Sequence, residues 1–419
     1  MKRVLIVCDT FPPQFAPRMG YLCKFIGEFG WEAYVVSGMR QSIRADFASL
    51  VGYSKETHII PQKKHRKWNL LHAWTIFSRY DYLRGEYDLR RKAIEVALRV
   101  KPDVILACPS GLFPLCSAYY VSNKLNIPLC VDYRDLEEQR QFNASDKRRK
   151  SLYRVFESIV SCHKTDHRNE ILTKADAVSS VTPWHRDILS RFNKHAYLIY
   201  NGFDPERFMP VAQAEKTSTF KIAYVGTLST VVDRDPTLLF KAIKSLADRG
   251  DIEVGKFCIE FYSGYENYKH HQDLAESIGV SRFVIFNDYV PTNKVPEILH
   301  EASILLVLGS GNIKQSNVIM TTKMFEYFAV NRPILSVPND HGCKQEALKE
   351  NNAGVSADSV DEVVDFILPL YREWQEKGCV NGRTDMRKID KFSRRVQAQQ
   401  FTEMFDAAIK EHHNRKVAG

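Results

Sequence analysis

The sequence predicts an α/β protein made of two consecutive Rossmann-like domains, and three observations support this. The chain has 419 residues, which is more than one ordinary domain holds. Short apolar runs rich in β-branched residues alternate with longer segments of helical periodicity, as in a parallel sheet covered by helices on both faces. This alternation starts afresh after a turn-rich break at residues 201–205, so two sheets of domain size are expected.

The first half contains five apolar runs that we expect to be strands. They are residues 3–8, 32–36, 104–107, 129–132 and 177–181. Between the first two, residues 18–29 carry apolar side chains at helical spacing. Gly30 follows this segment and should end the helix.

The second half repeats the pattern with another five expected strands. They are residues 221–225, 257–262, 283–286, 304–308 and 334–337. The last segment, 391–410, has Phe392, Val396, Phe401, Met404, Phe405 and Ala408 at helical spacing. The expected organisation is a first domain over 1–200, a second over 205–385, and a closing helix over 390–415. Periodicity leaves open which domain this helix joins, and a return to the first is one option.

The composition excludes several classes of protein. Hydrophobic residues make up 44% and charged residues 26% of the chain, as in a folded enzyme rather than a disordered or fibrous protein. The nine cysteines are scattered and form no CxxC pair, which argues against a disulfide framework or a zinc site. The apolar stretch at residues 4–8 is too short for a signal peptide, and no run approaches the ~20 apolar residues of a membrane span. We therefore expect a cytoplasmic protein.

The charge is concentrated in the first half of the chain. Residues 1–200 hold 32 Lys and Arg against 20 Asp and Glu, whereas the remainder has a net charge of −3. Basic and aromatic residues interleave over 63–80, and a second basic cluster occupies 147–150. Such a segment suits the surface of an anionic membrane, so a peripheral position on the inner face of the cell membrane is expected. The alternative is a solvated insertion. No nucleic-acid-reading module accompanies the cluster, so nucleic acid is not an expected partner.

The stretch 321–335, TTKMFEYFAVNRPIL, is the most informative in the sequence. It predicts a helix that starts at a Thr cap and leads through a turn into a buried strand. Lys323 lies in the first turn, where the helix dipole disfavours a cation unless an anion binds there as well. Glu326 lies one turn later and could accept hydrogen bonds from a diol such as a ribose. The alternative interpretation is a surface Lys–Glu pair of little energetic weight.

This stretch resembles the donor-site helix of the family-4 retaining glycosyltransferases, which have the GT-B fold. Further segments resemble the same family, in particular its branch in bacterial polysaccharide and lipopolysaccharide biosynthesis, and they occur in the right order over most of the chain. They are MKRVLIVCDTFPP, FIGEFGWEAYVVS, IPLCVDYRDL, ADAVSSVTP, YNGFDPERF and FKIAYVGTL. The resemblance implies two facing Rossmann-like domains with the active site in the interdomain cleft. It makes the first domain the acceptor-binding one and the second the nucleotide-sugar donor-binding one.

The resemblance also implies roles for individual residues of the second domain. Gly226 and Thr227 let the backbone approach the donor phosphates, Arg234 pairs with the diphosphate, and Glu326 holds the ribose. Thr321, Thr322 and Lys323 bind the diphosphate from the helix start. The segment with Tyr289 and Val290 lies along the nucleobase.

One position departs from the family pattern. The family has a second glutamate eight residues before Glu326, where this chain has Val318. Its contacts to the transferred sugar must come from elsewhere, with Asn312, Gln315 and Asn317 as candidates. The identity of the sugar is therefore not given by the resemblance.

The acceptor side is expected at strand ends of the first domain, because strand ends in open α/β sheets face the ligand. Asp132, Arg134 and Asp135 end one strand, and Asp132 or Asp135 could orient the acceptor hydroxyl. The alternative there is a buried Asp–Arg pair that closes a loop. The other acceptor-side candidates are Ser110, Gly20 and Arg18, and Arg18 either touches phosphate or caps its loop. A lone His185 is expected to be structural.

The function expected from these features is transfer of a sugar from a nucleotide-diphosphate sugar to a saccharide or lipid-linked acceptor. The expected catalytic residues are Asp135, Arg234 and Lys323. Lys323, Arg234 and the helix start can stabilise the leaving diphosphate without a metal, so neither metal nor cofactor is expected. Asp233-Arg234-Asp235 has the Asp-x-Asp form of metal-dependent glycosyltransferases of another fold, which we interpret as coincidence. If stereochemistry is retained, as the resemblance implies, the departing phosphate can take the acceptor proton.

Three alternatives stay open beside this function. A nucleotide-sugar 2-epimerase has the same fold but would need carboxylates placed for elimination. A non-catalytic nucleotide-sugar-binding subunit is compatible with Val318. A Rossmann dehydrogenase is disfavoured, because no G-x-G-x-x-G follows either opening strand.

Overall fold

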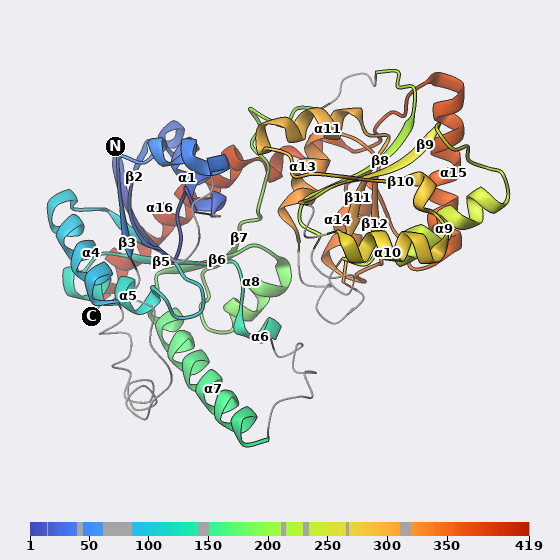
Figure 1. Ribbon diagram of the computed structural model, residues 1–419. Helices are drawn as coiled ribbons and strands as arrows, with labels where there is room; N and C mark the ends of the chain where they lie inside the picture. The colour runs from blue at the N-terminus through green and yellow to red at the C-terminus, as the bar shows by residue number, and fades with distance from the viewer. Residues whose placement is uncertain are drawn as a thin grey trace. The chain divides into compact units, whose positions relative to one another are not determined.

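The chain folds into two compact α/β units. In the computed structural model the described residues are 1–14, 16–39, 45–61, 86–140, 151–210, 215–228, 234–264, 268–310 and 320–418. The first unit comprises Met1–Asn201 together with Arg394–Gly419, and the second comprises Gly202–Ser393. Figure 1 colours the chain from the N-terminus to the C-terminus.

The first unit is built on a seven-stranded parallel sheet in the order β3-β2-β1-β4-β5-β6-β7. Its strands are β1 (Lys2–Cys8), β2 (Trp31–Met39), β3 (Glu56–Pro61), β4 (Val104–Cys108), β5 (Leu129–Tyr133), β6 (Ala177–Ser180) and β7 (Ala196–Leu198). Its helices are α1 (Pro17–Ile26), α4 (Tyr87–Val100), α5 (Leu115–Leu125), α6 (Glu137–Arg140), α7 (Ser151–Lys174), α8 (Pro183–Ser190) and α16 (Arg394–Ala418). The strand order reverses between β1 and β4, as in a Rossmann-like fold.

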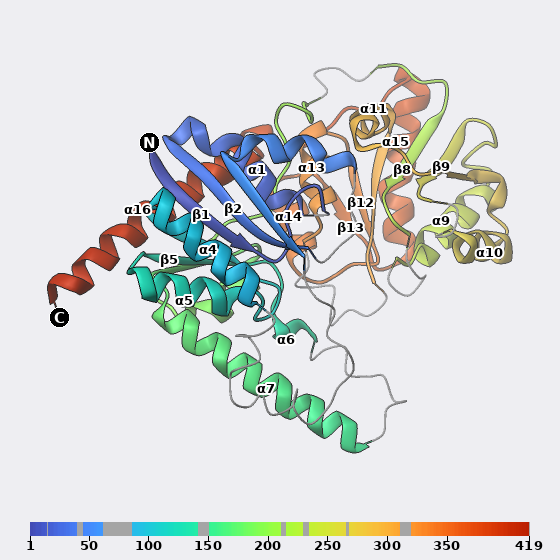
Figure 2. The same ribbon diagram turned by 60° about the vertical axis from the view of Figure 1, so that its left-hand side comes forward.

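The two faces of this sheet have separate cores. One core joins alternate residues of β1 and β2 to α1 and α16, and the other joins the intervening residues to α4, α5 and α8. Figure 2 shows α1 and α16 on one side of the sheet and α4 and α5 on the other. Trp31 packs edge-on against Phe405 of α16, with ring centroids 5.2 Å apart. Alternation of side chains along buried strands therefore accounts for both layers.

The second unit has a six-stranded parallel sheet in the order β10-β9-β8-β11-β12-β13. Its strands are β8 (Phe220–Val225), β9 (Phe257–Tyr262), β10 (Val284–Asn287), β11 (Ile304–Leu308), β12 (Ile334–Val337) and β13 (Gly354–Ser356). Its helices are α9 (Thr237–Asp248), α10 (Lys269–Ile278), α11 (Val295–Glu301), α13 (Thr322–Val330), α14 (Cys343–Glu350) and α15 (Val360–Lys377). Helices α9, α10 and α15 cover one face of the sheet, and α11, α13 and α14 cover the other (Figure 1).

The fold class expected from the sequence is confirmed, with small differences at element ends. The helix expected over 18–29 is α-helical only to Ile26, and Gly27–Phe29 form a 3₁₀ turn. Gly30 ends this turn in the left-handed conformation, at φ 77°. The strand expected at 283–286 is Val284–Asn287, because Phe283 belongs to a 3₁₀ turn. Strands β3, β7 and β13 were not predicted.

Phe392 lies outside the helix to which its spacing assigned it. It stacks on Phe328 at 5.8 Å and packs against Phe325 at 5.2 Å, both on α13 of the second unit. The helix α16 begins only at Arg394, and its Phe401, Met404, Phe405 and Ala408 lie in the core of the first unit. The apolar series of the C-terminal segment therefore serves two different cores.

Candidate functional site

The second sheet has its topological switch point between β8 and β11. Strand β8 pairs with β9 on one side and with β11 on the other, and the order of the strands reverses there. In open α/β sheets ligands bind outside the carboxyl ends of the strands at this point. Gly226 and Thr227 follow β8, and Gly309 follows β11. The main-chain N–H of Asp235 donates to the carbonyl of Gly309 at 3.1 Å, so the loop after β8 returns to the end of β11.

Lys323 brings its ammonium group to this point from the first turn of α13. Its Nζ donates to the hydroxyl of Tyr224 at 2.9 Å and lies 4.1 Å from the centre of the Tyr224 ring. The Tyr224 hydroxyl in turn donates to the carbonyl of Thr227 at 3.0 Å. The side chain of a buried β8 residue thus holds the ammonium over the turn that follows its own strand. Lys323 is therefore tied to the sheet through Tyr224.

Gly226 lies directly beneath the Lys323 ammonium. Its φ is 135°, a conformation that side-chain-bearing residues rarely adopt. A Cβ built on Gly226 would overlap both Nζ and Cε of Lys323. The glycine is therefore required twice, once for the turn and once for the close approach of the lysine.

Replacement of Gly226 by alanine is expected to weaken nucleoside diphosphate binding by about tenfold. The lysine end is flexible, so the overlap is relieved by moving the ammonium away from its position rather than by unfolding. Calorimetric titration measures the loss. Gly255→Ala is the matched control, because Gly255 also has a positive φ, 87°, but nothing within 4 Å of an added Cβ. Both variants should lose about 1–2 kcal/mol of stability, and only the first should lose affinity. Equal affinities would contradict this role of Gly226.

The N-terminus of α13 offers hydrogen-bond donors and a buried polar atom. Thr321 is the N-cap residue, as expected, but the expectation that its side chain caps the helix is wrong. Its Oγ1 is instead buried, with no hydrogen-bond partner among the described residues. The first N–H groups of a helix have no partner within it, and the α13 first turn contains no acidic side chain. Together with Lys323, this arrangement favours an anion.

Glu326 follows Thr322 and Lys323 on the partly exposed face of α13, whereas Phe325 and Tyr327 are buried. The Tyr327 hydroxyl accepts a hydrogen bond from the N–H of Val225 at 3.4 Å, which joins α13 to the end of β8. Burial raises the pKa of Tyr327, so this hydroxyl stays protonated. The helix that carries Lys323 and Glu326 is thereby fixed to the strand that carries Tyr224.

The remaining residues expected on the donor side lie at the same end of the sheet or outside the described residues. Tyr289 and Val290 follow the edge strand β10, and Tyr289 is 54% exposed. Arg234 is half-buried, and its carbonyl lies 2.8 Å from Nε2 of His271. Asn317 lies outside the described residues, as do Val318 and the other two candidates for sugar contacts.

In the first unit the structure pairs Arg18 with Asp132 rather than Asp132 with Arg134. Arg18 donates from Nε and Nη2 to the two oxygens of Asp132, at 2.8 and 2.9 Å. Its other three donors go to the carbonyls of Ile199 and Tyr200 and to Oδ1 of Asn201. A guanidinium has five N–H donors, so none remains for a phosphate. Arg18 and Asp132 thus form a buried pair that ties α1 and β5 to the segment that follows β7.

Arg134 and Asp135 lie outside this buried pair. Nη2 of Arg134 lies 3.4 Å from Oδ1 of Asp9, at the end of β1. Burial disfavours the charged guanidinium, but the nearby carboxylates, Asp9 foremost, raise the pKa of Arg134 overall. Asp135 and Ser110 are exposed at the carboxyl ends of their strands. Both residues lie at the end of the sheet where open α/β sheets bind ligands.

Gly20 has a packing reason instead. A Cβ there would lie 2.7 Å from Cγ of Pro12 and 2.9 Å from Cβ of Leu50, so α1 approaches its neighbours only with glycine at this position.

His185 is a buried neutral histidine. Its Nδ1 contacts the hydroxyl of Thr182, and burial lowers its pKa to about 4 against the opposing effect of Asp135 and Glu138. The arrangement agrees with a structural role at the start of α8.

Several expectations concern metals and membranes. In the part of the chain that the structure describes, no group of three or more His, Cys, Asp or Glu could hold a metal ion. The nine cysteines are free thiols. Within the described ranges, no helix combines the length and apolar character needed to cross a bilayer. The basic segments 63–80 and 147–150 lie outside the described residues.

Two residues of the site could not be found from the sequence. Tyr224 is one of several apolar or aromatic residues in a buried strand, and nothing in the pattern marks its hydroxyl as a partner of Lys323. His271 lies on α10, 37 residues from the Arg234 carbonyl that it contacts. Only the folded chain brings these groups to the same strand ends.

Comparison with known proteins supports the fold alone. No protein-family model and no curated protein sequence matches the chain. Among solved structures, it is similar to HepE of Anabaena in complex with UDP-glucose, with 12% identity, coverage of 97% of this chain and 100% of that one, and a TM-score of 0.63. It is also similar to the lipopolysaccharide outer core galactosyltransferase WaaB, with 11% identity, coverage of 97% and 99%, and a TM-score of 0.59. A putative UDP-N-acetylglucosamine 2-epimerase from Listeria monocytogenes has 12% identity, coverage of 99% and 98%, and a TM-score of 0.55. The chain therefore has the two-domain α/β fold of the GT-B proteins.

Proposed function

We propose that this chain is a glycosyltransferase that moves a sugar from a nucleotide-diphosphate sugar to a saccharide or lipid-linked acceptor in cell-surface polysaccharide synthesis. The observation that carries the proposal is the convergence of the Lys323 ammonium, the α13 N-terminus and Gly226 at the switch point of a parallel sheet. A diphosphate is an anion whose negative charge suits this arrangement. The similarity to HepE, solved with UDP-glucose, and to a lipopolysaccharide galactosyltransferase supports the sugar-transfer chemistry.

In the proposed reaction the bond between the anomeric carbon and the diphosphate oxygen breaks while the acceptor oxygen bonds to that carbon. Lys323 and the first-turn N–H groups of α13 stabilise the negative charge that develops on the leaving diphosphate. Arg234 adds a second positive charge, so no metal or cofactor is needed. With retention of configuration, the acceptor hydroxyl attacks from the face of the leaving group and gives its proton to a diphosphate oxygen. Asp135 orients this hydroxyl, and Glu326 holds the ribose of the donor.

The experiment that tests the proposal is a scan of thermal stability against nucleotide sugars. A ligand that binds only the folded state raises the unfolding midpoint. We expect one of the UDP-, GDP- and dTDP-sugars to do so, equally with Mg²⁺ or with EDTA, and Lys323→Ala and Glu326→Ala to diminish the shift. A CMP-sugar carries a single phosphate and is the negative control. No shift with any nucleotide sugar, or the same shift in both variants, would refute the donor site. A shift that requires Mg²⁺ would refute the metal-free mechanism.

The 2-epimerase remains the second candidate, because a putative 2-epimerase has the same fold. An epimerase converts its nucleotide sugar with no acceptor present, whereas a transferase leaves it unchanged apart from slow hydrolysis. Incubation of the stabilising nucleotide sugar with the protein alone, followed by chromatography of the sugar, separates the two. A non-catalytic subunit would bind the nucleotide sugar but would not convert it, either alone or with an acceptor present.

We also propose that the first unit binds the surface of an anionic membrane, where a lipid-linked acceptor would be found. Aromatic and basic side chains lie together on its α4 and α5: the guanidinium of the half-buried Arg90 is 5.1 Å from the Tyr120 ring centre, and Nζ of the exposed Lys124 is 5.8 Å from it. Tyr87 and Tyr120 are 54% and 42% exposed. Interfacial binding favours this combination of cations and aromatic rings. Sedimentation with vesicles that shows no preference for anionic lipid would refute it.

A further inference from the structure

We propose that His271 is a positioning residue for diphosphate binding, which acts by holding the main chain of Arg234 in place. His271 lies on α10, and nothing in the sequence pattern connects it with the donor site. The inference rests on the proposed function, because Arg234 is assigned there to the diphosphate. It adds a residue that touches neither donor nor acceptor.

The contact is between a buried imidazole ring and a main-chain carbonyl. The side chain of His271 is fully buried, and its Nε2 lies 2.8 Å from the carbonyl oxygen of Arg234. A carbonyl oxygen only accepts hydrogen bonds, so Nε2 must carry the hydrogen and donate it. Burial lowers the pKa of His271 in spite of this hydrogen bond, and the neighbouring His270 lowers it further. The ring is therefore neutral, with its hydrogen on Nε2.

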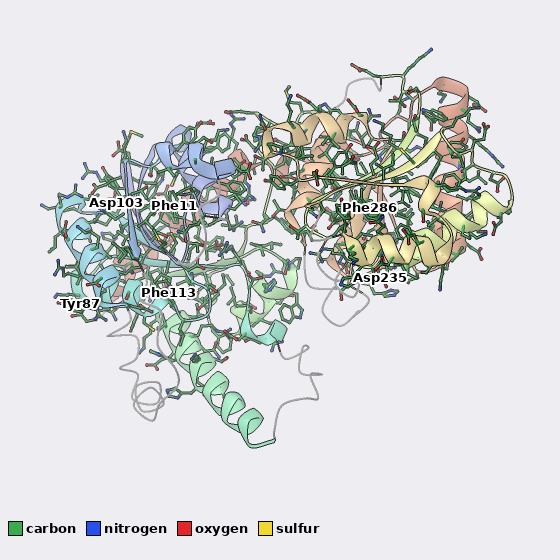
Figure 3. The ribbon with its side chains drawn as sticks, viewed as in Figure 1. Phe11, Tyr87, Asp103, Phe113, Asp235 and Phe286 are labelled. Atoms are coloured by element: carbon green, nitrogen blue, oxygen red, sulfur yellow. The ribbon has the colours of Figure 1, made fainter. Side chains whose placement is uncertain are left out.

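The carbonyl that His271 holds belongs to a loop that is fixed on two other sides. The next residue, Asp235, donates its N–H to the carbonyl of Gly309 at the end of β11, at 3.1 Å. Its carboxylate accepts the N–H of Thr237 at 2.9 Å, at the start of α9. Figure 3 shows Asp235 beside α10, the helix from which His271 reaches the loop. The main chain at Arg234 and Asp235 is thus attached to α10, to the end of β11 and to the start of α9. This is the end of the sheet where Lys323 lies.

The other ring nitrogen argues against a purely space-filling role for this histidine. Nδ1 of His271 is buried and has no hydrogen-bond partner among the described residues. A buried polar atom without a partner is unfavourable, and an apolar side chain of similar size would avoid it. What the histidine supplies in exchange is the single hydrogen bond to Arg234. We infer that this bond keeps the arginine where the diphosphate requires it, since a displaced guanidinium loses charge-assisted hydrogen bonds.

Two substitutions separate the hydrogen bond from the volume of the ring. His271→Leu removes the donor, whereas His271→Gln places an amide N–H close to the position of Nε2. The ligands are the nucleoside diphosphate that stabilises the wild type best, out of UDP, GDP, dTDP and CDP, and the corresponding nucleoside without phosphate. We expect His271→Leu to weaken the diphosphate about fivefold and His271→Gln to restore it to within about twofold. Nucleoside affinity should stay unchanged in both.

A double-mutant cycle with Arg234→Ala shows whether the effect passes through the arginine. In that background His271→Leu should cost no further affinity, because the group that it positions is gone. Loss of stability with unchanged diphosphate affinity, or the same loss of affinity in the Arg234→Ala background, would overturn the proposal. If His271→Leu does not fold, His271→Asn serves in its place, because the shorter amide does not reach the carbonyl and should give the same loss.

Different results would refute the proposed function and the role of His271. If no nucleoside diphosphate binds the wild-type protein, the proposed function is wrong. If one binds and Arg234→Ala weakens it while His271→Leu does not, only the role of His271 is wrong.

Discussion

Replacement of Lys323 by alanine is expected to weaken nucleoside diphosphate binding by about 10- to 100-fold and to leave nucleoside binding unchanged. A hydrogen bond to a charged group contributes about 1.5–3 kcal/mol, and each 1.4 kcal/mol is a factor of ten in affinity. The ammonium is already held by Tyr224 over Gly226, so little conformational entropy is lost when the phosphate binds. Titration calorimetry with the diphosphate and with the bare nucleoside measures both affinities.

Lys349→Ala is the control for the loss of a positive charge from the same unit. Lys349 is exposed in the last turn of α14. Its removal should change diphosphate affinity less than twofold, since exposed charges are screened by salt. If Lys323→Ala binds the diphosphate as tightly as this control, the ammonium is not a phosphate ligand.

Removal of the Asp132 carboxylate is expected to destabilise the first unit by about 3–5 kcal/mol. Arg18 and Asp132 have side chains 3% and 0% exposed, so alanine at position 132 leaves a buried guanidinium without its counter-charge. Ser179 also loses the carboxylate oxygen to which its hydroxyl donates at 2.8 Å. Thermal unfolding should show a fall of roughly 10 °C or more in the midpoint of this unit.

Asp135 provides the matched comparison three residues away. It is exposed, so Asp135→Ala should change stability by less than about 0.5 kcal/mol. If Asp135 orients the acceptor, this variant should instead lose transfer activity with donor affinity unchanged. A wild-type midpoint for Asp132→Ala would contradict the buried pair, and full transfer activity of Asp135→Ala would contradict the acceptor role.

The sequence predicted the interior strands of both sheets and one edge strand, β10, and missed the other three edge strands. All ten expected strands are present, and most of them are recognisable because a strand buried on both faces is a continuous apolar run. Strands β7 and β13 have three residues each, and β3 is only half-buried. These three lie at the edges of their sheets, where one side of the strand has no neighbour and the sequence is under little pressure to be apolar. Periodicity carries no signal for such segments.

Local sequence signals mark Lys323 and Gly226 more clearly than they mark the partner of Asp132, for a physical reason. Lys323 and Gly226 belong to local signals, namely a cation in the first turn of a helix and a glycine after a strand. The structure brings them into contact. On the acceptor side, the alternative interpretation was a buried Asp–Arg pair within the segment of Asp132, Arg134 and Asp135, and it did not include Arg18. In the structure, Asp132 of β5 pairs with Arg18 of α1, which lies 114 residues away in the sequence. The local spacing of residues does not predict contacts between residues so far apart in the sequence.

The most direct test of the donor site is a crystal structure of the protein with its best-binding nucleoside diphosphate. We predict a phosphate oxygen within about 3 Å of Lys323 Nζ and of the first N–H groups of α13, with the ribose hydroxyls on Glu326. A well-ordered nucleotide bound elsewhere, with Lys323 still on Tyr224 and no phosphate beside it, would contradict this donor site.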